Sequence, residues 1–188
     1  MRKMRSKKVI GITGMPGSGK STFAEVARSL GFKVIVMGDF LREEAKKRKI
    51  KPTAENLGKL MIKIREEKGE KILAKLTVKA VRNMSEEKIL IDGVRSLAEL
   101  EEFRRRFPNF KLVAIHAPQE SRFKRVSGRA RSDDPSAWKS FIRRELRELR
   151  VGVGSAIALA DKIVENSGSI EEFKETVEKV LKEIIGDV

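Results

Sequence analysis

Residues 14–21 have the sequence Gly-Met-Pro-Gly-Ser-Gly-Lys-Ser, which satisfies the pattern G-x-x-x-x-G-K-[ST]. The octapeptide follows a short β-branched segment, 8–13, and precedes a segment with helical apolar spacing, 20–30. A phosphate-binding loop requires this position between a strand and a helix. A chance match in a chain of this length is on the order of one in a hundred, so motif and position together predict such a loop.

The chemistry of this loop predicts a bound nucleoside triphosphate and a magnesium ion. Its glycines allow successive backbone N–H groups to surround a phosphate chain, and the N-terminus of the following helix adds positive potential. In this pattern Lys20 contacts the β- and γ-phosphates, the Ser21 hydroxyl ligates Mg²⁺ and Thr22 lies near the α-phosphate. We therefore expect ATP and Mg²⁺ as cofactors, held by Gly14, Met15, Pro16, Gly17, Ser18, Gly19, Lys20, Ser21 and Thr22.

The composition predicts one folded domain with a strongly basic surface. The 188 residues are 40% hydrophobic and 37% charged, and the formal net charge is +15. This charge favours polyanionic partners, either nucleotides or nucleic acid, although many basic residues also stand beside glutamate at helical spacing, as on a solvated surface. The sequence lacks the interleaved aromatic and basic residues that stack on RNA. Charge alone therefore does not establish nucleic-acid binding.

The sequence contains no signals for secretion or for a membrane. It has no cysteine, and its start, Met-Arg-Lys-Met-Arg-Ser-Lys-Lys, lacks the apolar stretch of a signal peptide. No apolar segment approaches the roughly 20 residues that span a bilayer. We therefore expect a cytoplasmic protein without a membrane-embedded part.

The order of the predicted elements indicates an α/β fold with a parallel sheet. Short apolar segments predict strands at 8–13, 32–37, 88–91, 110–117 and 162–165. Helical spacing, together with capping boxes at 96–99 and 169–172 and the Asp134-Pro135 step, predicts helices at 20–30, 39–49, 119–129 and 169–185 and from residues 96 and 134. Two more helices, broken near Gly69, occupy 53–84. This order predicts three layers in a single domain over residues 1–188: a five-stranded parallel sheet with helices on both faces.

Residues 38–42, Gly-Asp-Phe-Leu-Arg, stand at the end of the second predicted strand. They resemble the G-D-x-L-R segment of adenylate kinases, whose arginine holds the phosphate of the acceptor. The resemblance implies that Arg42 binds the substrate. Asp39 also falls where dephospho-CoA kinases carry the aspartate that serves as their base, which implies a catalytic role for Asp39.

Residues 91–95, Ile-Asp-Gly-Val-Arg, end the third predicted strand. They are similar to the L-D-G-F-P-R element of adenylate kinases with one residue missing. By this likeness Asp92 organises water around Mg²⁺ and Arg95 binds the acceptor. Both aspartates, Asp39 and Asp92, stand where ligands of parallel sheets gather, at the carboxyl ends of strands.

Residues 125–129, Arg-Val-Ser-Gly-Arg, resemble the R-x-x-G-R entry to the lid of adenylate kinases. The resemblance implies that Arg125 covers the adenine, that Arg129 meets the phosphates and that residues 128–135 form a short lid. On the next predicted helix, Arg143, Arg144 and Arg147 are placed like the arginines that contact the transferred phosphoryl group in that family. The likeness implies a catalytic role for Arg143.

Residues 160–169 closely resemble the A-D-x-V-I-x-N-S-G-S turn that precedes the last helix of dephospho-CoA kinases. In that family the segment helps to surround the adenine of the donor. The resemblance therefore places Asn166 among the residues that bind the cofactor.

These motifs, in this order, cover nearly the whole chain, which resembles an archaeal P-loop kinase family related to adenylate kinase and dephospho-CoA kinase. The resemblance implies transfer of the γ-phosphoryl of Mg-ATP, assisted by Lys20, to a small nucleotide-like acceptor, either a nucleoside monophosphate or dephospho-CoA. Residues 53–84 would be the helical insertion that binds this acceptor. The missing proline in 91–95 and the short lid depart from adenylate kinases and leave the acceptor open.

The sequence leaves two other classes of function open besides a small-molecule kinase. One is a nucleic-acid-associated ATPase or polynucleotide kinase, in which the basic surface binds RNA with a steep dependence on salt. The other is a nucleotide-binding regulatory module without catalysis, and the intact pair of Lys20 and Ser21 argues against it. The sequence does not specify the oligomeric state or the choice of ATP over GTP.

Overall fold

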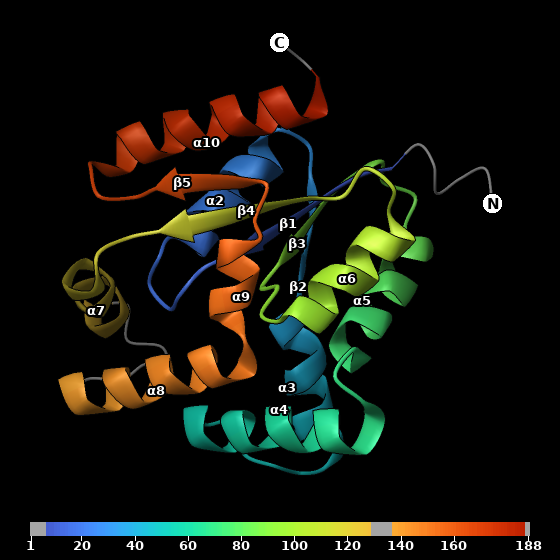
Figure 1. Ribbon diagram of the computed structural model, residues 1–188, viewed down its shortest axis with the longest axis vertical. Helices are drawn as coiled ribbons and strands as arrows, with labels where there is room; N and C mark the ends of the chain where they lie inside the picture. The colour runs from blue at the N-terminus through green and yellow to red at the C-terminus, as the bar shows by residue number, and fades with distance from the viewer. Residues whose placement is uncertain (1–6, 129–136, 187–188) are drawn as a thin grey trace.

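Five parallel strands form the centre of the molecule (Figure 1). The computed structural model describes residues 7–128 and 137–186. The strands are β1 (Lys8–Thr13), β2 (Lys33–Val36), β3 (Lys88–Asp92), β4 (Lys111–His116) and β5 (Lys162–Glu165), in the order β2-β3-β1-β4-β5. All neighbouring pairs are parallel, and Asp92 is in register with both Ile12 and Val36. The carboxyl ends of the strands therefore meet at one edge of the sheet, as the alternation of elements predicts.

Helices pack on both faces of this sheet and confirm the predicted three-layer α/β class (Figure 1). In chain order they are α2 (Lys20–Ser29), α3 (Met37–Lys47), α4 (Ala54–Lys68), α5 (Ile72–Arg82), α6 (Leu97–Arg106), α7 (Gln119–Gly128), α8 (Trp138–Val151), α9 (Val153–Ala158) and α10 (Ile170–Ile185). Among the described residues, no helix has both the length and the apolar character needed to span a membrane.

Alternate strand residues fill two separate cores because successive side chains of a strand point to opposite faces of the sheet. Ile10 and Ile12 of β1 pack with α2 and α10, where Phe23 and Phe173 are buried. On the other face, buried residues of the strands pack with α5, α6 and α9, around Phe103. The sheet is thus covered on both faces, and its carboxyl edge is the surface available for a ligand.

Helix α4 is attached through a third, smaller core. Leu60, Met61 and Ile64 of α4 pack against Leu41 and Ala45 of α3. This arrangement places α4 beyond the carboxyl edge of the sheet and on the same side of the molecule as α8 (Figure 1). A pocket lies between α4 and the carboxyl edge of the sheet, lined by Leu57, Gly58 and Met61 of α4 and by Arg95 after β3.

The two predicted capping boxes differ in the structure. Ser169 and Glu172 form the complete box at the start of α10. Ser96 caps α6 by accepting a hydrogen bond from the backbone N–H of Glu99 at 3.2 Å, but the Glu99 carboxylate accepts from the backbone N–H of Arg95 at 2.8 Å. Its other oxygen accepts from Arg65 Nη2 at 2.7 Å. The second box is half formed because a buried arginine competes for this carboxylate.

Part of the predicted lid lies outside the described residues. Residues 129–135 of the predicted lid, 128–135, are not among the described residues. They include Arg129 and the predicted helix start at Asp134-Pro135. The described part of the following helix, α8, begins at Trp138.

Candidate active site

The loop of residues 14–19 joins β1 to α2 at the carboxyl edge of the sheet. Its last residue, Gly19, is the N-cap of α2 and has φ 115°, a conformation that favours glycine. Asn166, after β5, donates from Nδ2 to the carbonyl oxygen of Ser18 at 2.8 Å. A Cβ atom on Gly19 would lie 2.3 Å from this Nδ2 atom. Glycine at this position thus allows both the turn of the loop and the contact with Asn166.

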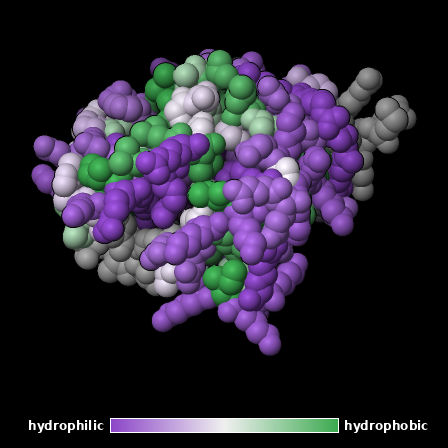
Figure 2. Space-filling view, turned by 60° about the horizontal axis from the view of Figure 1, so that its bottom comes forward, coloured by the Kyte–Doolittle hydropathy of each residue, from purple (hydrophilic) through white to green (hydrophobic). Residues whose placement is uncertain are grey.

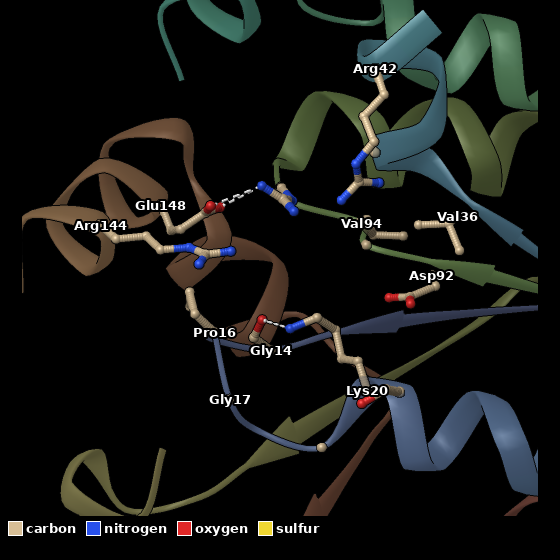
Figure 3. A pocket seen from close by; sticks show the side chains of 15 residues that line it. Gly14, Pro16, Gly17, Lys20, Val36, Arg42, Asp92, Val94, Arg144 and Glu148 are labelled. Carbon is tan, nitrogen blue, oxygen red and sulfur yellow. Dashed lines mark hydrogen bonds and ion pairs between the residues drawn. The ribbon is translucent and has the colours of Figure 1, made fainter. Parts of the chain in front are cut away.

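Lys20 lies folded back over the loop (Figure 3). Its Nζ donates to the carbonyl oxygens of Gly14 at 2.6 Å and Met15 at 3.1 Å. Burial lowers the pKa of Lys20 to about 8, and the nearby Asp92 carboxylate opposes this shift. Burial likewise raises the pKa of Asp92, against the effect of Lys20. A phosphate group at the loop would add negative charge beside the ammonium and stabilise its protonated form.

The pKa of Lys20 leads to a prediction on binding. Without Mg²⁺, the affinity for a non-hydrolysable ATP analogue is expected to be constant up to about pH 7, to be roughly halved at pH 8 and to fall about tenfold by pH 9. The reason is that the free protein loses the proton of Lys20 near pH 8, while the bound phosphates raise the pKa and retain it. Titration calorimetry at pH 7, 8 and 9 measures this. Lys20→Ala should remove the dependence, and equal wild-type affinities at pH 7 and 9 would contradict the prediction.

The phosphate pocket is the cavity of about 130 Å³ beside Lys20. Its lining includes residues of the loop, of the strand ends and of α3 and α8: Gly14, Pro16, Gly17, Gly19, Lys20, Ser21, Val36, Gly38, Arg42, Asp92, Gly93, Val94, Arg95, Arg144 and Glu148. The structure thus brings together predicted residues from three separate motifs: the loop, 38–42 and 91–95. Figure 3 shows the Arg42 and Arg144 side chains around the same space as Lys20 and Asp92. Arg95 lines this space as well.

A second cavity adjoins the phosphate pocket on the side of α4, and we call it the acceptor-side pocket. Its volume is about 80 Å³. It is lined by Gly38, Leu41, Arg42, Leu57, Gly58, Met61, Arg95, Arg144, Arg147 and Glu148. Arg42, Arg95 and Arg144 line both pockets and therefore stand at the junction between them.

Arg95 is held in place by two carboxylates. Its Nη1 donates to both carboxylate oxygens of Glu148 at 2.9 Å, and its backbone N–H donates to Glu99. Glu148 raises the pKa of Arg95. Sequence reasoning missed Glu148, because a glutamate on a charged amphipathic helix is ordinarily a surface residue; its side chain here is only 8% exposed.

Arg42 and Asp39 lie one helical turn apart at the start of α3. The helix begins at Met37, directly after β2, so Asp39 lies in its first turn rather than at a strand end. Asp39 Oδ1 and Arg42 Nη1 form an ion pair at 2.7 Å, and the Asp39 side chain is 62% exposed. Asp39 is outside the lining of the phosphate pocket, whereas Arg42 and Asp92 belong to it.

Arg125 and Asn166 meet on the other side of the loop. Arg125 Nη2 donates to the backbone oxygen of Asn166 at 3.0 Å and to its Oδ1 at 3.3 Å. A cavity of about 420 Å³ adjoins this pair and is lined by Gly17, Gly19, Ser21, Thr22, Arg125, Asn166, Gly168, Ile170 and Phe173. Its volume and mixed polarity suit a small organic ligand. The structure thus joins two predicted residues that are 41 positions apart.

The arginines of α8 point in different directions because consecutive helical residues are about 100° apart. Arg144 lines the phosphate pocket. Arg143, predicted to be catalytic, instead lines a cavity between α4 and α8. Contact of Arg143 with a transferred phosphoryl group would therefore require a movement of α8.

A second buried ion pair, which the sequence analysis did not predict, links helices α7 and α8 to the phosphate-binding loop. Arg122 of α7 forms an ion pair with Glu145 of α8. The same guanidinium donates from Nη1 to the carbonyl oxygen of Pro16 at 3.3 Å. Both side chains belong to amphipathic helices whose charged positions are expected to face solvent, so no sequence pattern distinguishes them. Arg122 thereby connects α8 to the phosphate-binding loop.

The residues around Lys20 can accommodate Mg²⁺. Ser21 and Asp92 line the same pocket. Within residues 7–128 and 137–186, no cluster of three or more histidine, cysteine, aspartate or glutamate side chains could hold a metal on its own. This suits Mg²⁺, which is commonly bound through one or two protein oxygens together with substrate phosphates and water.

The order of the strands, the loop and the arginine-lined pockets define a P-loop protein with a kinase-like fold and a nucleotide-binding site. A family model described as an AAA domain matches residues 13–141. The UPF0200 proteins of Thermococcus kodakarensis and Pyrococcus abyssi are 44% and 42% identical to this chain, over 94% of it in both cases and 98% and 97% of their own lengths. The chain therefore belongs to the UPF0200 family, and these two relatives are archaeal.

Solved structures share the same fold at low sequence identity. The protein TT1252 of Thermus thermophilus superposes with a TM-score of 0.61 at 24% identity, covering 94% of this chain and 97% of that one. A shikimate kinase of Acinetobacter baumannii in complex with shikimate has a TM-score of 0.60 at 16% identity, over 99% and 97%. A gluconokinase of Sinorhizobium meliloti has 0.57 at 18%, over 97% and 96%. At these identities the likeness extends to the fold alone.

Proposed function

We propose that this protein transfers the γ-phosphoryl group of Mg-ATP to a small nucleotide-like acceptor, such as a nucleoside monophosphate or dephospho-CoA. One observation carries the proposal: Arg42, Arg95 and Arg144 line both the phosphate pocket and the acceptor-side pocket. A phosphoryl group that passes from one pocket to the other would remain beside positive charge throughout. Such preorganised charge is what phosphoryl transfer requires of a protein.

The donor is proposed to bind along the loop. Residues 14–22 hold its phosphates, and its adenine occupies the cavity beside Arg125 and Asn166. Ser21 and Asp92 would hold Mg²⁺, which when bound neutralises negative charge on the phosphate oxygens. Arg129 is proposed to meet the phosphates as well.

The reaction is proposed to take place beside Lys20. An oxygen of the acceptor forms a bond to the γ-phosphorus, and the bond from that phosphorus to the β,γ-bridging oxygen breaks, which leaves ADP. Lys20 stabilises the charge that develops between the β- and γ-phosphates. Where the acceptor is a hydroxyl, Asp39 would take its proton after separating from Arg42. Arg143 would reach the phosphoryl group only if α8 moved.

A labelling screen tests this proposal directly. The protein is incubated with Mg²⁺ and ATP labelled at the γ-phosphate, together with nucleoside monophosphates, dephospho-CoA or RNA with a 5′-hydroxyl end. The proposal expects label in one of the small acceptors. Label in RNA would favour the polynucleotide kinase instead. Release of inorganic phosphate alone, with no acceptor labelled, would reject the proposal.

Arg42 provides a prediction that separates acceptor from donor. Arg42→Ala is expected to reduce use of the acceptor by about ten- to a hundredfold, because a charge-assisted hydrogen bond to phosphate is lost. The affinity for an ATP analogue should change less than twofold. Acceptor kinetics and analogue titration measure the two effects. Arg82→Ala is the control, since Arg82 ends α5 at the opposite edge of the sheet. Equal losses for donor and acceptor would contradict this placement of Arg42.

A further inference from the structure

A large cavity between α4 and α8 has no role in the proposed phosphoryl transfer. Its volume is about 560 Å³. Four arginines and two glutamates supply its charged lining: Arg65, Arg143, Arg147, Arg150, Glu66 and Glu70. We call it the α4–α8 cleft. Figure 2 brings this side of the molecule forward and shows a mainly hydrophilic surface with hydrophobic patches among the charged residues. The excess of arginine makes the cleft attractive to an anion.

Arg65 has unused hydrogen-bonding capacity in this cleft. The residue is only 5% exposed, and its Nη2 donates to Glu99 at 2.7 Å. Its Nε and Nη1 are buried without a hydrogen-bond partner, which is energetically unfavourable. Nε lies 3.8 Å from the Glu70 carboxylate, too far for a hydrogen bond, and the Glu70 side chain is 67% exposed. Glu70 can therefore turn outward and admit a ligand oxygen.

The arginines of α8 add to this positive charge. Arg143, Arg147 and Arg150 occur at helical positions i, i+4 and i+7, and therefore lie along one side of α8. None of the three makes a hydrogen bond or an ion pair with another residue that the structure describes. Among the residues that the structure describes, a phosphate bound in the cleft would therefore have no carboxylate to displace from these three side chains.

The cleft continues into the acceptor-side pocket through Arg147, which lines both. Gly58 of α4 makes room for this side chain: a Cβ atom at Gly58 would lie only 2.7 Å from Arg147 Nη1. One ligand could thus contact Arg147 while it extends into both spaces. The cleft is also linked to Arg95, because the Glu99 carboxylate joins Arg65 to the Arg95 backbone.

We propose that the α4–α8 cleft binds a phosphate-bearing group, and that this group belongs to the acceptor, at a distance from its reacting atom. The assignment to the acceptor rests on the proposed function and on the continuity through Arg147. The acceptor would then carry two separated anionic groups, one at Arg42 and Arg95 and the other in the cleft. A free anion would make the same contacts in the cleft as a phosphate group of the acceptor. The experiments below distinguish these two ligands.

Calorimetric titration with inorganic pyrophosphate tests the subsite without any requirement for catalysis. The protein is first saturated with Mg²⁺ and a non-hydrolysable ATP analogue, so that the loop is occupied. Arg150→Ala is expected to weaken pyrophosphate binding about tenfold, because one charge-assisted contact is lost. Arg82→Ala removes the same charge at the opposite edge of the sheet and should leave the affinity unchanged. Equal affinities in Arg150→Ala and the wild-type protein would overturn the inference.

Kinetics with the acceptor identified by labelling then determine the source of the phosphate. At saturating ATP, pyrophosphate should compete with the acceptor, and Arg150→Ala should raise the KM for the acceptor without a matching loss of kcat. Inhibition or activation that is not competitive would overturn the assignment to the acceptor and indicate a free anion. If no acceptor is labelled, the proposed function fails, while the titration of Arg150→Ala still decides whether the cleft binds phosphate.

Discussion

Lys20→Ala is expected to reduce phosphoryl transfer by at least about a thousandfold while the fold persists. In the proposed reaction, the ammonium would meet the charge that develops between the β- and γ-phosphates. Burial lowers the pKa of Lys20 from 10.5 to about 8. The ammonium therefore still predominates at pH 7, but it is less stable in the folded protein than in the unfolded chain. Its removal should therefore leave the melting temperature equal or higher.

Two measurements decide this prediction. Turnover of labelled ATP with the identified acceptor gives the loss of activity, and thermal unfolding followed by circular dichroism shows whether the variant folds. Lys63→Ala is a suitable control, because Lys63 is exposed on α4 and makes only a weak surface ion pair at 3.9 Å. Turnover of Lys20→Ala near the wild-type rate would reject the proposed chemistry. A collapsed melting temperature would instead assign Lys20 a structural role.

The sequence was sufficient to predict features that depend on local patterns. Short apolar segments predicted all five strands, and the loop of residues 14–21 follows from glycine conformation and the need for a helix N-terminus. The resemblance of 160–169 to dephospho-CoA kinases also placed Asn166 near the donor. In the structure Asn166 contacts Ser18 and Arg125. Its role in binding the cofactor remains a prediction.

Charged residues buried between helices could not be predicted in the same way. Glu99, Glu148 and Arg65 all belong to helices rich in lysine, arginine and glutamate, where helical spacing assigns charged positions to solvent. Their burial depends on how α4, α6 and α8 pack together, which no local pattern specifies. Asp39 illustrates the related problem of boundaries: α3 begins directly after β2, so this residue lies on a helix and faces Arg42.

The fully buried Glu99 leads to the largest expected effect on stability. Its carboxylate accepts from Arg65 Nη2 at 2.7 Å and from the Arg95 backbone N–H at 2.8 Å. Glu99→Ala would leave Arg65, itself 5% exposed, as a buried charge without its closest partner. Removal of one member of a buried ion pair costs about 3–5 kcal/mol. We expect a loss of this size in the free energy of unfolding.

Glu101→Ala is the matched control on the same helix. Glu101 pairs with Lys71 at 3.1 Å, but its side chain is 56% exposed, so the expected change is less than about 1 kcal/mol. Urea unfolding at equal slope gives both values. The double variant Arg65→Met, Glu99→Ala removes both charges and should recover part of the loss, because a buried ion pair can be replaced by apolar side chains at little cost. If instead Glu99→Ala is as stable as Glu101→Ala, the carboxylate does not hold α4 and Arg95 together. The single variant Arg65→Met completes the cycle. If the double variant loses the sum of the losses in Arg65→Met and Glu99→Ala, Arg65 and Glu99 stabilise the fold independently rather than as a pair.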